Sequence, residues 1–450
     1  MTKDMTEGSP IRLILHFALP LLLGNLFQQT YNIIDAAIVG KFLGEEELAS
    51  VGASSSVQFL ILGFCIGVCC GFAIPVAQYF GGKKYEMMRK SIFHAGFLSA
   101  GIALVLTVLC ALLCPWILHM LSTPENIFGD AYRYLLVIFL GIPFTILYNL
   151  LSGIMRAVGD SKTPFLFLAF STVLNILLDL GFIVVLPLGV SGAALATILS
   201  QAVSGLLCLL YICKRFPVLH ISRKHCHLQK KYTRQMLVMG IPMGLQYSIT
   251  AVGSMVMQSA NNGLGSVYIS GFTAGMRIKQ FLMCPFDAIG TAVSTFCSQN
   301  FGAKKIDRVK VGLRKGILIG VSYGIAIGVL AICFGRTMSL LFLKASATQA
   351  LDASGKYLAC LGLFFWCLGI LNVCRLSVQG LGFSGRAVFN GVLEMIARIT
   401  VSLVFVPMYH FTAICFADQT AWLSACLYIL PTCIWCVRKI EVTPPVKTAP

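Results

Sequence analysis

The chain has 450 residues, of which 57% are apolar and only 11% are charged, and its mean hydropathy is +0.85. An ordinary soluble domain carries roughly a quarter charged residues, so this composition excludes a water-soluble enzyme. The net charge of +17 comes from basic residues in short clusters between apolar stretches, not on one face or arm, and this excludes a nucleic-acid partner.

Twelve apolar stretches are long enough to cross a membrane, because a spanning helix needs about 20 mostly apolar residues. In chain order they cover residues 11–37, 50–79, 92–120, 131–154, 164–186, 190–213, 235–260, 265–299, 313–340, 355–380, 386–408 and 412–437. The sequence therefore predicts an all-α integral membrane protein with twelve transmembrane helices.

Basic residues are distributed unequally between the two sides of the predicted membrane. Twenty-five of the 34 Lys and Arg residues lie in the two terminal segments, in every second loop and at one adjoining helix start, and only five lie on the opposite side. Cytoplasmic loops carry an excess of Lys and Arg. We therefore expect a multi-pass protein of the cell inner (plasma) membrane with both termini in the cytoplasm.

The two halves of the chain repeat the same landmarks at an almost constant spacing. Pro20 corresponds to Pro242, AQYFGGKK at 77–84 corresponds to SQNFGAKK at 298–305, and segment 156–161 corresponds to segment 379–384, with shifts of 222, 221 and 223 residues. Three landmarks at one offset predict an internal duplication.

The duplication predicts two homologous six-helix lobes, 1–213 and 235–450, joined by a basic cytoplasmic linker at 214–234. Because six is an even number, both lobes enter the membrane in the same sense. Parallel repeats of this kind are related by a pseudo-two-fold axis along the membrane normal and are typical of transporters.

Acidic residues within a membrane are costly and indicate function. Those well within the predicted spans are Asp35, Asp179, Asp287 and Glu394. Asn175 precedes Asp179 by four residues, so the two side chains lie on one helix face and can share an ion. Asp35 and Asp179 are expected at a similar depth in the amino-terminal lobe.

Thr197 can add a hydroxyl group to this pair, and Tyr132 or Tyr134 can add a phenol. Two carboxyl groups in a low-dielectric pocket do not both ionise easily, so we expect a proton as the coupling ion in preference to sodium. The same oxygen atoms also suit sodium, and residue types alone do not decide between the two ions.

The second lobe contains other charges. Asp287 follows Arg277 and Lys279 on one predicted helix, which indicates an ion pair with a neighbour or a contact with an anionic group of a substrate. Glu394 and Arg398 are four residues apart and are expected to neutralise each other.

Together these landmarks resemble the multidrug and toxic compound extrusion (MATE) family, and the resemblance covers essentially the whole chain. It is carried by Pro20, by Asp35 followed by AAIVGKFLG and EEELASVGA, by the repeated ends of spans two and eight, and by RAVGD at 156–160. The resemblance implies a secondary antiporter that expels amphipathic, cationic organic compounds in exchange for protons or sodium ions.

Within that family, the chain is most similar to the DinF-like branch. The acid pair with Asn175, Thr197 and a tyrosine of span four resembles the amino-lobe cation site of that branch. Pro20 stands 15 residues before Asp35, as the proline does at the bend of span one, and this implies a conformational hinge. Span seven has no acid where the NorM branch has one, which favours coupling in the amino-terminal lobe.

Two other functions were compared with antiport. A flippase for lipid-linked sugars belongs to the same superfamily, but such relatives usually have more spans and basic cavities. An intramembrane enzyme would need aspartate-rich metal motifs, which the sequence lacks. We therefore expect a protein without catalytic activity, cofactor or metal. We expect it to be a monomer whose partners are organic small molecules and membrane lipids.

Overall fold

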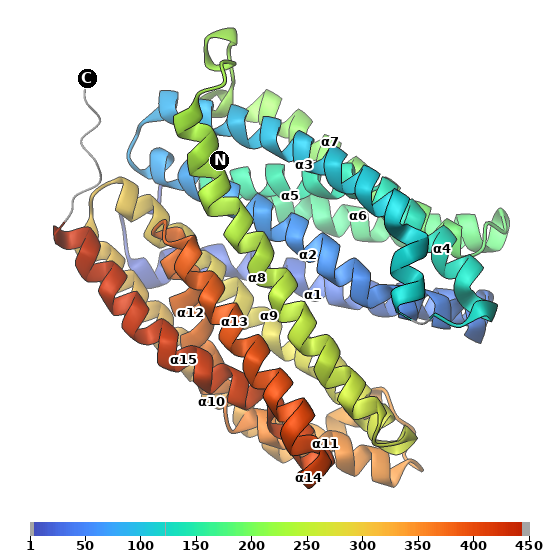
Figure 1. Ribbon diagram of the computed structural model, residues 1–450. Coiled ribbons are helices and arrows are strands. Elements are labelled where there is room, and N and C mark those ends of the chain that lie inside the picture. The colour runs from blue at the N-terminus through green and yellow to red at the C-terminus, as the bar shows by residue number, and fades with distance from the viewer. Residues whose placement is uncertain (1–3, 122, 443–450) are drawn as a thin grey trace. The chain divides into compact units, whose positions relative to one another are not determined.

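The computed structural model describes residues 4–121 and 123–442, and this part of the chain is helical without strands (Figure 1). The helices of the first half are α1 (Pro10–Phe42), α2 (Glu45–Gly81), α3 (Tyr85–Met120), α4 (Glu125–Leu140), α5 (Ile142–Ala157), α6 (Lys162–Leu180) and α7 (Val190–Arg215). Those of the second half are α8 (Lys230–Asn262), α9 (Ser266–Gly302), α10 (Ile306–Met338), α11 (Thr348–Gly362), α12 (Phe365–Gly380), α13 (Ser384–Thr400), α14 (Val406–Tyr409) and α15 (Phe411–Val442).

Ten helices of the described chain are long and apolar enough to cross a membrane, and two bent helix pairs bring the number to twelve. The predicted twelve spans are thus confirmed when each bent pair counts as one span. The carboxyl tail beyond residue 442, which we expect in the cytoplasm, lies outside the described residues.

Two spans that were expected to be single helices are broken. Span 131–154 consists of α4 and α5, which meet at 44°, and span 355–380 consists of α11 and α12, which meet at 55°. At the first break, Pro143 has no N–H to continue the helical hydrogen bonds, and a side chain at Gly141 would collide with Ile198 of α7. Hydropathy reports length and apolarity, so it does not reveal such bends.

The duplication is repeated in the backbone geometry. Lys83 and Lys304 are both left-handed, with φ of 55° and 60°, and each follows the end of a long helix. The left-handed glycines Gly159 and Gly382 form a second pair. These pairs stand at the same offsets as the sequence landmarks, so the two halves share local structure as well as sequence.

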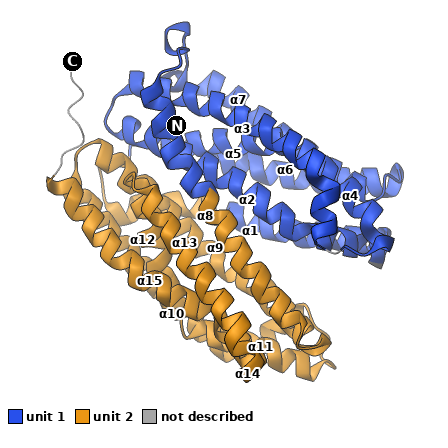
Figure 2. Cartoon of the chain, viewed as in Figure 1, with its two compact units in different colours: residues 1–4, 23–244 blue, residues 5–22, 245–450 orange. Residues whose placement is uncertain are grey.

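The chain consists of two compact units (Figure 2). Unit 1 contains Leu23–Gly244, and unit 2 contains Met5–Leu22 together with the chain from Leu245 onward. Helix α1 therefore begins in unit 2 and helix α8 begins in unit 1. Each helix changes unit two residues after its proline, Pro20 or Pro242, where one helical hydrogen bond is missing.

The repeated helix end of each unit contacts the helix that begins in that unit, at its first turns in unit 1 and at the segment before it in unit 2. In unit 2, Asn300 Nδ2 donates to the carbonyl oxygen of Met5 at 3.1 Å. In unit 1, the Tyr79 hydroxyl donates to Gln235 Oε1 at 2.9 Å. Tyr79 and Asn300 occupy the same place in the two repeats, so in both halves this position contacts the beginning of a long helix or the segment before it.

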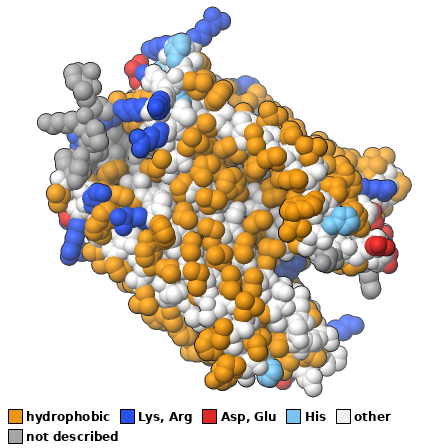
Figure 3. Space-filling model, in the orientation of Figure 1, with side chains coloured by type: hydrophobic (Ala, Val, Ile, Leu, Met, Phe, Trp, Pro, Cys, Tyr) orange, Lys and Arg blue, Asp and Glu red, His pale blue; other side chains and the backbone are white. Residues whose placement is uncertain are grey.

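An apolar core fills each unit, around Phe72 and Phe139 in unit 1 and around Phe365 and Trp422 in unit 2. Many other large apolar side chains are exposed, and hydrophobic side chains cover much of the face seen in Figure 3. Exposed apolar surface of this extent is expected where lipid replaces water as the solvent.

Candidate cation site

Asn175 and Asp179 are buried on one face of α6, as their spacing predicts. The amide of Asn175 is oriented by its hydrogen bonds: Nδ2 donates to Asp179 Oδ2 at 3.0 Å, and Oδ1 accepts from the backbone N–H of Thr197 at 3.1 Å. Asn175 therefore joins α6 to α7 and holds one oxygen of the Asp179 carboxyl group.

Asp35 of α1 is brought to Asp179, and the two carboxyl groups are hydrogen-bonding neighbours. One buried oxygen of each, Asp35 Oδ1 and Asp179 Oδ1, receives no N–H or O–H donor from the described residues. Two carboxylates at such close range repel each other. A proton or cation bound between them removes that repulsion.

The structure distinguishes between the two candidate tyrosines of α4. Tyr134 is buried within electrostatic range of both acids, and its hydroxyl is hydrogen bonded to Gln58 of α2. Tyr132 packs against the apolar core of unit 1 instead. Residues two apart on a helix point to nearly opposite sides, so only Tyr134 joins the acid pair.

Tyr31 also belongs to this site, although sequence reasoning did not select it. Its hydroxyl lies 2.8 Å from Thr197 Oγ1, and its electrostatic neighbours are Asp35, Tyr134 and Asp179. Tyr31 precedes Asp35 by four residues, the same spacing as Asn175 and Asp179. The helical period therefore places Tyr31 and Asp35 on one face of α1, and this spacing is the sequence signal for Tyr31.

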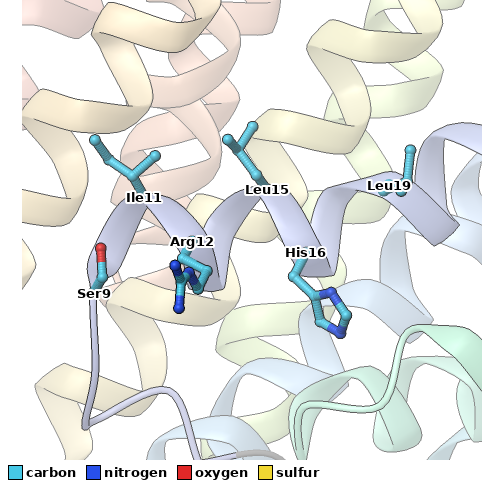
Figure 4. A pocket seen from close by; sticks show the side chains of 6 residues that line it. All are labelled: Ser9, Ile11, Arg12, Leu15, His16 and Leu19. Atoms are coloured by element: carbon cyan, nitrogen blue, oxygen red, sulfur yellow. The ribbon is translucent and has the colours of Figure 1, made fainter.

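Pro20 lies on α1 away from this group, inside a helix that continues through it. Figure 4 shows the exposed side of the first turns of α1, where a shallow depression is lined by Ser9, Ile11, Arg12, Leu15, His16 and Leu19. No predicted site residue lines this depression, so it does not compete with the acid pair as the candidate site.

In unit 2, Lys279 pairs with Asp418 and not with Asp287. Lys279 Nζ lies 2.5 Å from Asp418 Oδ2, which also accepts a hydrogen bond from the Tyr357 hydroxyl at 2.9 Å. An ion pair between Lys279 and Asp287 is excluded because eight residues separate them by about 12 Å along one helix. Sequence reasoning missed Asp418 because it was placed near the end of a span.

The predicted pair of Glu394 and Arg398 is confirmed, with Arg398 Nη1 3.4 Å from Glu394 Oε2. It is part of a larger network, because Arg398 Nε also lies 3.0 Å from Asp418 Oδ1 and Arg375 Nη1 lies 3.3 Å from Glu394 Oε1. Acids and bases alternate along this network, so each of its two acids lies between two basic side chains.

The remaining two residues proposed for the second lobe differ in their surroundings. Asp287 Oδ1 accepts a hydrogen bond from Asn372 Nδ2 at 3.2 Å and lies in the field of Arg375. Arg277 is half-buried on α9 and forms no ion pair with a described residue. The described residues also contain no group of three or more His, Cys, Asp or Glu side chains that could hold a metal ion.

The comparisons with known proteins all point to the same family. The MatE family model matches residues 20–181 and 242–408. The chain is 31% identical over 424 residues to "Probable multidrug resistance protein YpnP" of Bacillus subtilis (strain 168), covering 94% of this chain and 91% of that protein. It is 27% identical to "Multidrug export protein MepA" of Staphylococcus aureus (strain NCTC 8325 / PS 47), covering 94% of each.

Solved structures agree on the fold. The "Crystal structure of MATE in complex with MaL6" matches with a TM-score of 0.92 at 21% identity, covering 98% of this chain and all 100% of that one. The "Outward-facing conformation of a multidrug resistance MATE family transporter of the MOP superfamily" matches with a TM-score of 0.91 at 20% identity, covering 98% and 99%.

Proposed function

The chain belongs to the MatE family of multi-pass membrane transporters, and from this premise we propose that it exports amphipathic, cationic organic compounds in exchange for a coupling cation. Relatives named as multidrug resistance and multidrug export proteins support export of organic compounds. The assignment to the DinF-like branch remains a prediction.

The observation that carries this proposal is the pair of carboxyl groups of Asp35 and Asp179. Each presents a buried oxygen that accepts no hydrogen bond from the described residues, and the two lie on different helices, within unit 1. Ionisable groups in a membrane are expensive and are retained where ions pass. Asp287, Glu394 and Asp418, the acids within the spans of unit 2, contact Lys, Arg or Asn side chains, so the acid pair of unit 1 is the better candidate for coupling.

We propose that the coupling ion is a proton. A single proton shared between the two carboxyl groups relieves their repulsion without the full oxygen shell that a sodium ion requires. Each proton that enters across 100 mV supplies about 2.3 kcal/mol. For a neutral compound exchanged one-for-one, that energy corresponds to a concentration ratio of about fiftyfold. One-for-one exchange of a proton for a monovalent cation moves no net charge, so export of such a cation draws its energy from the pH gradient or from a second proton.

The binding of the proton would act on α1, because Asp35 lies on that helix and Pro20 interrupts its hydrogen bonds. A helix that bends at Pro20 can alternate between two positions, which makes Pro20 the proposed hinge of alternating access. We propose that this transport proceeds without a catalytic step, bound cofactor, nucleic acid or second subunit, and that the protein lies in the plasma membrane.

The test is efflux of a fluorescent organic cation from proteoliposomes under separately imposed proton and sodium gradients. The parent is compared with Asp35→Asn and Asp179→Asn, which keep the size of the side chain but remove the titrating group. We expect a proton gradient alone to drive transport in the parent and both substitutions to reduce it to background.

The matched control is Asp352→Asn, which removes an exposed acid of unit 2 that pairs with Arg336. This variant should transport like the parent. The site assignment is wrong if both acid-pair variants still transport. If neither gradient drives efflux, the antiport proposal fails and the flippase alternative is favoured.

A further inference from the structure

Two basic side chains at one end of unit 2 converge on the same aromatic ring. The guanidinium carbon of Arg386 lies 3.8 Å from the centroid of the Trp435 ring, and Lys439 Nζ lies 4.7 Å from it. Phe383 packs edge-on against Trp435, with 5.9 Å between ring centroids. We refer to Phe383, Arg386, Trp435 and Lys439 as the basic-aromatic cluster.

The cluster is built where two helices end side by side. Helix α13 begins at Ser384 and helix α15 ends at Val442, and the two helices pack against each other (Figure 1). The Tyr428 hydroxyl of α15 donates to the carbonyl oxygen of Arg386 at 3.2 Å, which fixes the start of α13 against the last turns of α15.

The positive charges of the cluster have no negative partner in the described part of the chain. Neither Arg386 nor Lys439 forms an ion pair there, and the nearby Glu441 pairs with Lys310. An aromatic ring attracts cations but carries no net charge. Two cations that repel each other over one ring are therefore complementary to an anion.

Exposed apolar side chains lead away from the cluster along both helices. On α15 they are Leu423, Leu427, Leu430 and Ile434, and on α13 they are Phe389 and Ile396. Their spacing of three, four or seven residues places each set in one stripe. Figure 3 shows basic side chains gathered near one end of unit 2, beside hydrophobic ones. An anionic head with apolar tails fits both features.

We propose that the basic-aromatic cluster binds the phosphate group of an anionic phospholipid, whose acyl chains lie along the two apolar stripes. The segments that carry Arg386 and Lys439 are predicted to face the cytoplasm, where the membrane leaflet contains anionic lipids. Tryptophan at the same level is typical of a membrane interface. The site is distinct from the acid pair and does not depend on the exported compound.

The experiment measures retention of phosphatidylglycerol by the purified full-length protein with native mass spectrometry, against phosphatidylcholine as the zwitterionic reference. The test variant carries Arg386→Gln with Lys439→Gln. The matched control carries Lys214→Gln with Arg215→Gln, which removes the same charge at the end of α7, in the corresponding place of the first half but without a tryptophan.

We expect the test variant to bind phosphatidylglycerol roughly thirtyfold more weakly than the parent, because each basic side chain near an anionic lipid contributes about a fivefold factor. The control variant and the charge-conserving Arg386→Lys with Lys439→Arg should bind within about threefold of the parent. Inorganic phosphate at the same concentration should not displace the lipid.

Three results would overturn the proposal. Equal losses in the test and control variants would show attraction by surface charge in general. Loss of binding in the charge-conserving variant would show that the positive charges are not what holds the lipid. Displacement by inorganic phosphate would show a site for a soluble anion instead of a lipid.

Discussion

Tyr31 and Tyr134 place two hydroxyl groups beside the acid pair from two different helices. Tyr31 shares a hydrogen bond with Thr197, and Tyr134 shares one with Gln58, so each phenol is held in position by a second partner. Hydroxyl groups fixed in this way can donate to a carboxylate or pass a proton to it. The acid pair therefore acts with its neighbours and not as two isolated acids.

This arrangement predicts different effects for tyrosines that are two residues apart. Tyr134→Phe and Tyr31→Phe should slow proton-driven efflux about five- to tenfold, because each removes a hydrogen bond worth about 1 kcal/mol. Tyr132→Phe should leave the rate unchanged, since Tyr132 packs in the core. Initial rates of dye efflux at matched protein levels measure the difference. An equal loss for Tyr132→Phe and Tyr134→Phe would contradict the assignment.

At the scale of elements, a network of buried ion pairs links four helices of unit 2. Lys279 comes from α9, Arg375 from α12, Glu394 and Arg398 from α13, and Asp418 from α15. The side chains of Asp418 and Glu394 are almost fully buried, with 1% and 3% exposure. Buried charges of this kind are tolerated only when each has an opposite charge.

Removing one member should therefore destabilise the unit. Among the described residues, Lys279→Met leaves Asp418 with Arg398 as its one remaining cationic partner. Breaking a buried pair in this way costs about 3–5 kcal/mol. The double variant Lys279→Met with Asp418→Asn removes both charges of this pair and keeps the net charge of the parent network, and it should unfold at a higher temperature than Lys279→Met alone. Thermal unfolding of the detergent-solubilised protein measures both.

The control for this prediction is Lys344→Met, which removes a charge from an exposed side chain between helices. It should unfold like the parent. If Lys279→Met is as stable as the parent, the network is not what holds these helices together.

At the scale of the whole molecule, the distribution of basic residues predicts how the chain is oriented in the membrane. Twenty-five Lys and Arg residues on one side against five on the other should keep both termini and the 214–234 linker in the cytoplasm. This asymmetry concerns the whole chain, because the opposite orientation would require most of the basic loops to cross the membrane.

Reporter fusions check this orientation. Alkaline phosphatase fused after Lys344 should be active, because the enzyme folds only outside the cytoplasm, and the same reporter fused after Lys224 should be inactive. Green fluorescent protein should show the opposite pattern. Active phosphatase after Lys224 would reverse the predicted topology.

The sequence by itself determined the membrane spans, their number and their duplication. A membrane requires about 20 apolar residues for each span, so hydropathy alone locates the spans. The helical period placed Asn175 next to Asp179 and Glu394 next to Arg398, because both pairs lie within one turn of one helix. These features depend on neighbours along the chain.

Only the tertiary structure decided which residues of different helices meet. It brought Tyr134 and not Tyr132 to the acids, paired Lys279 with Asp418 and not Asp287, and added Tyr31 to the site. These contacts depend on how each helix is rotated about its axis and where it bends, as at Gly141. Rotation and bending are set by packing between helices, which a pattern along one helix does not contain.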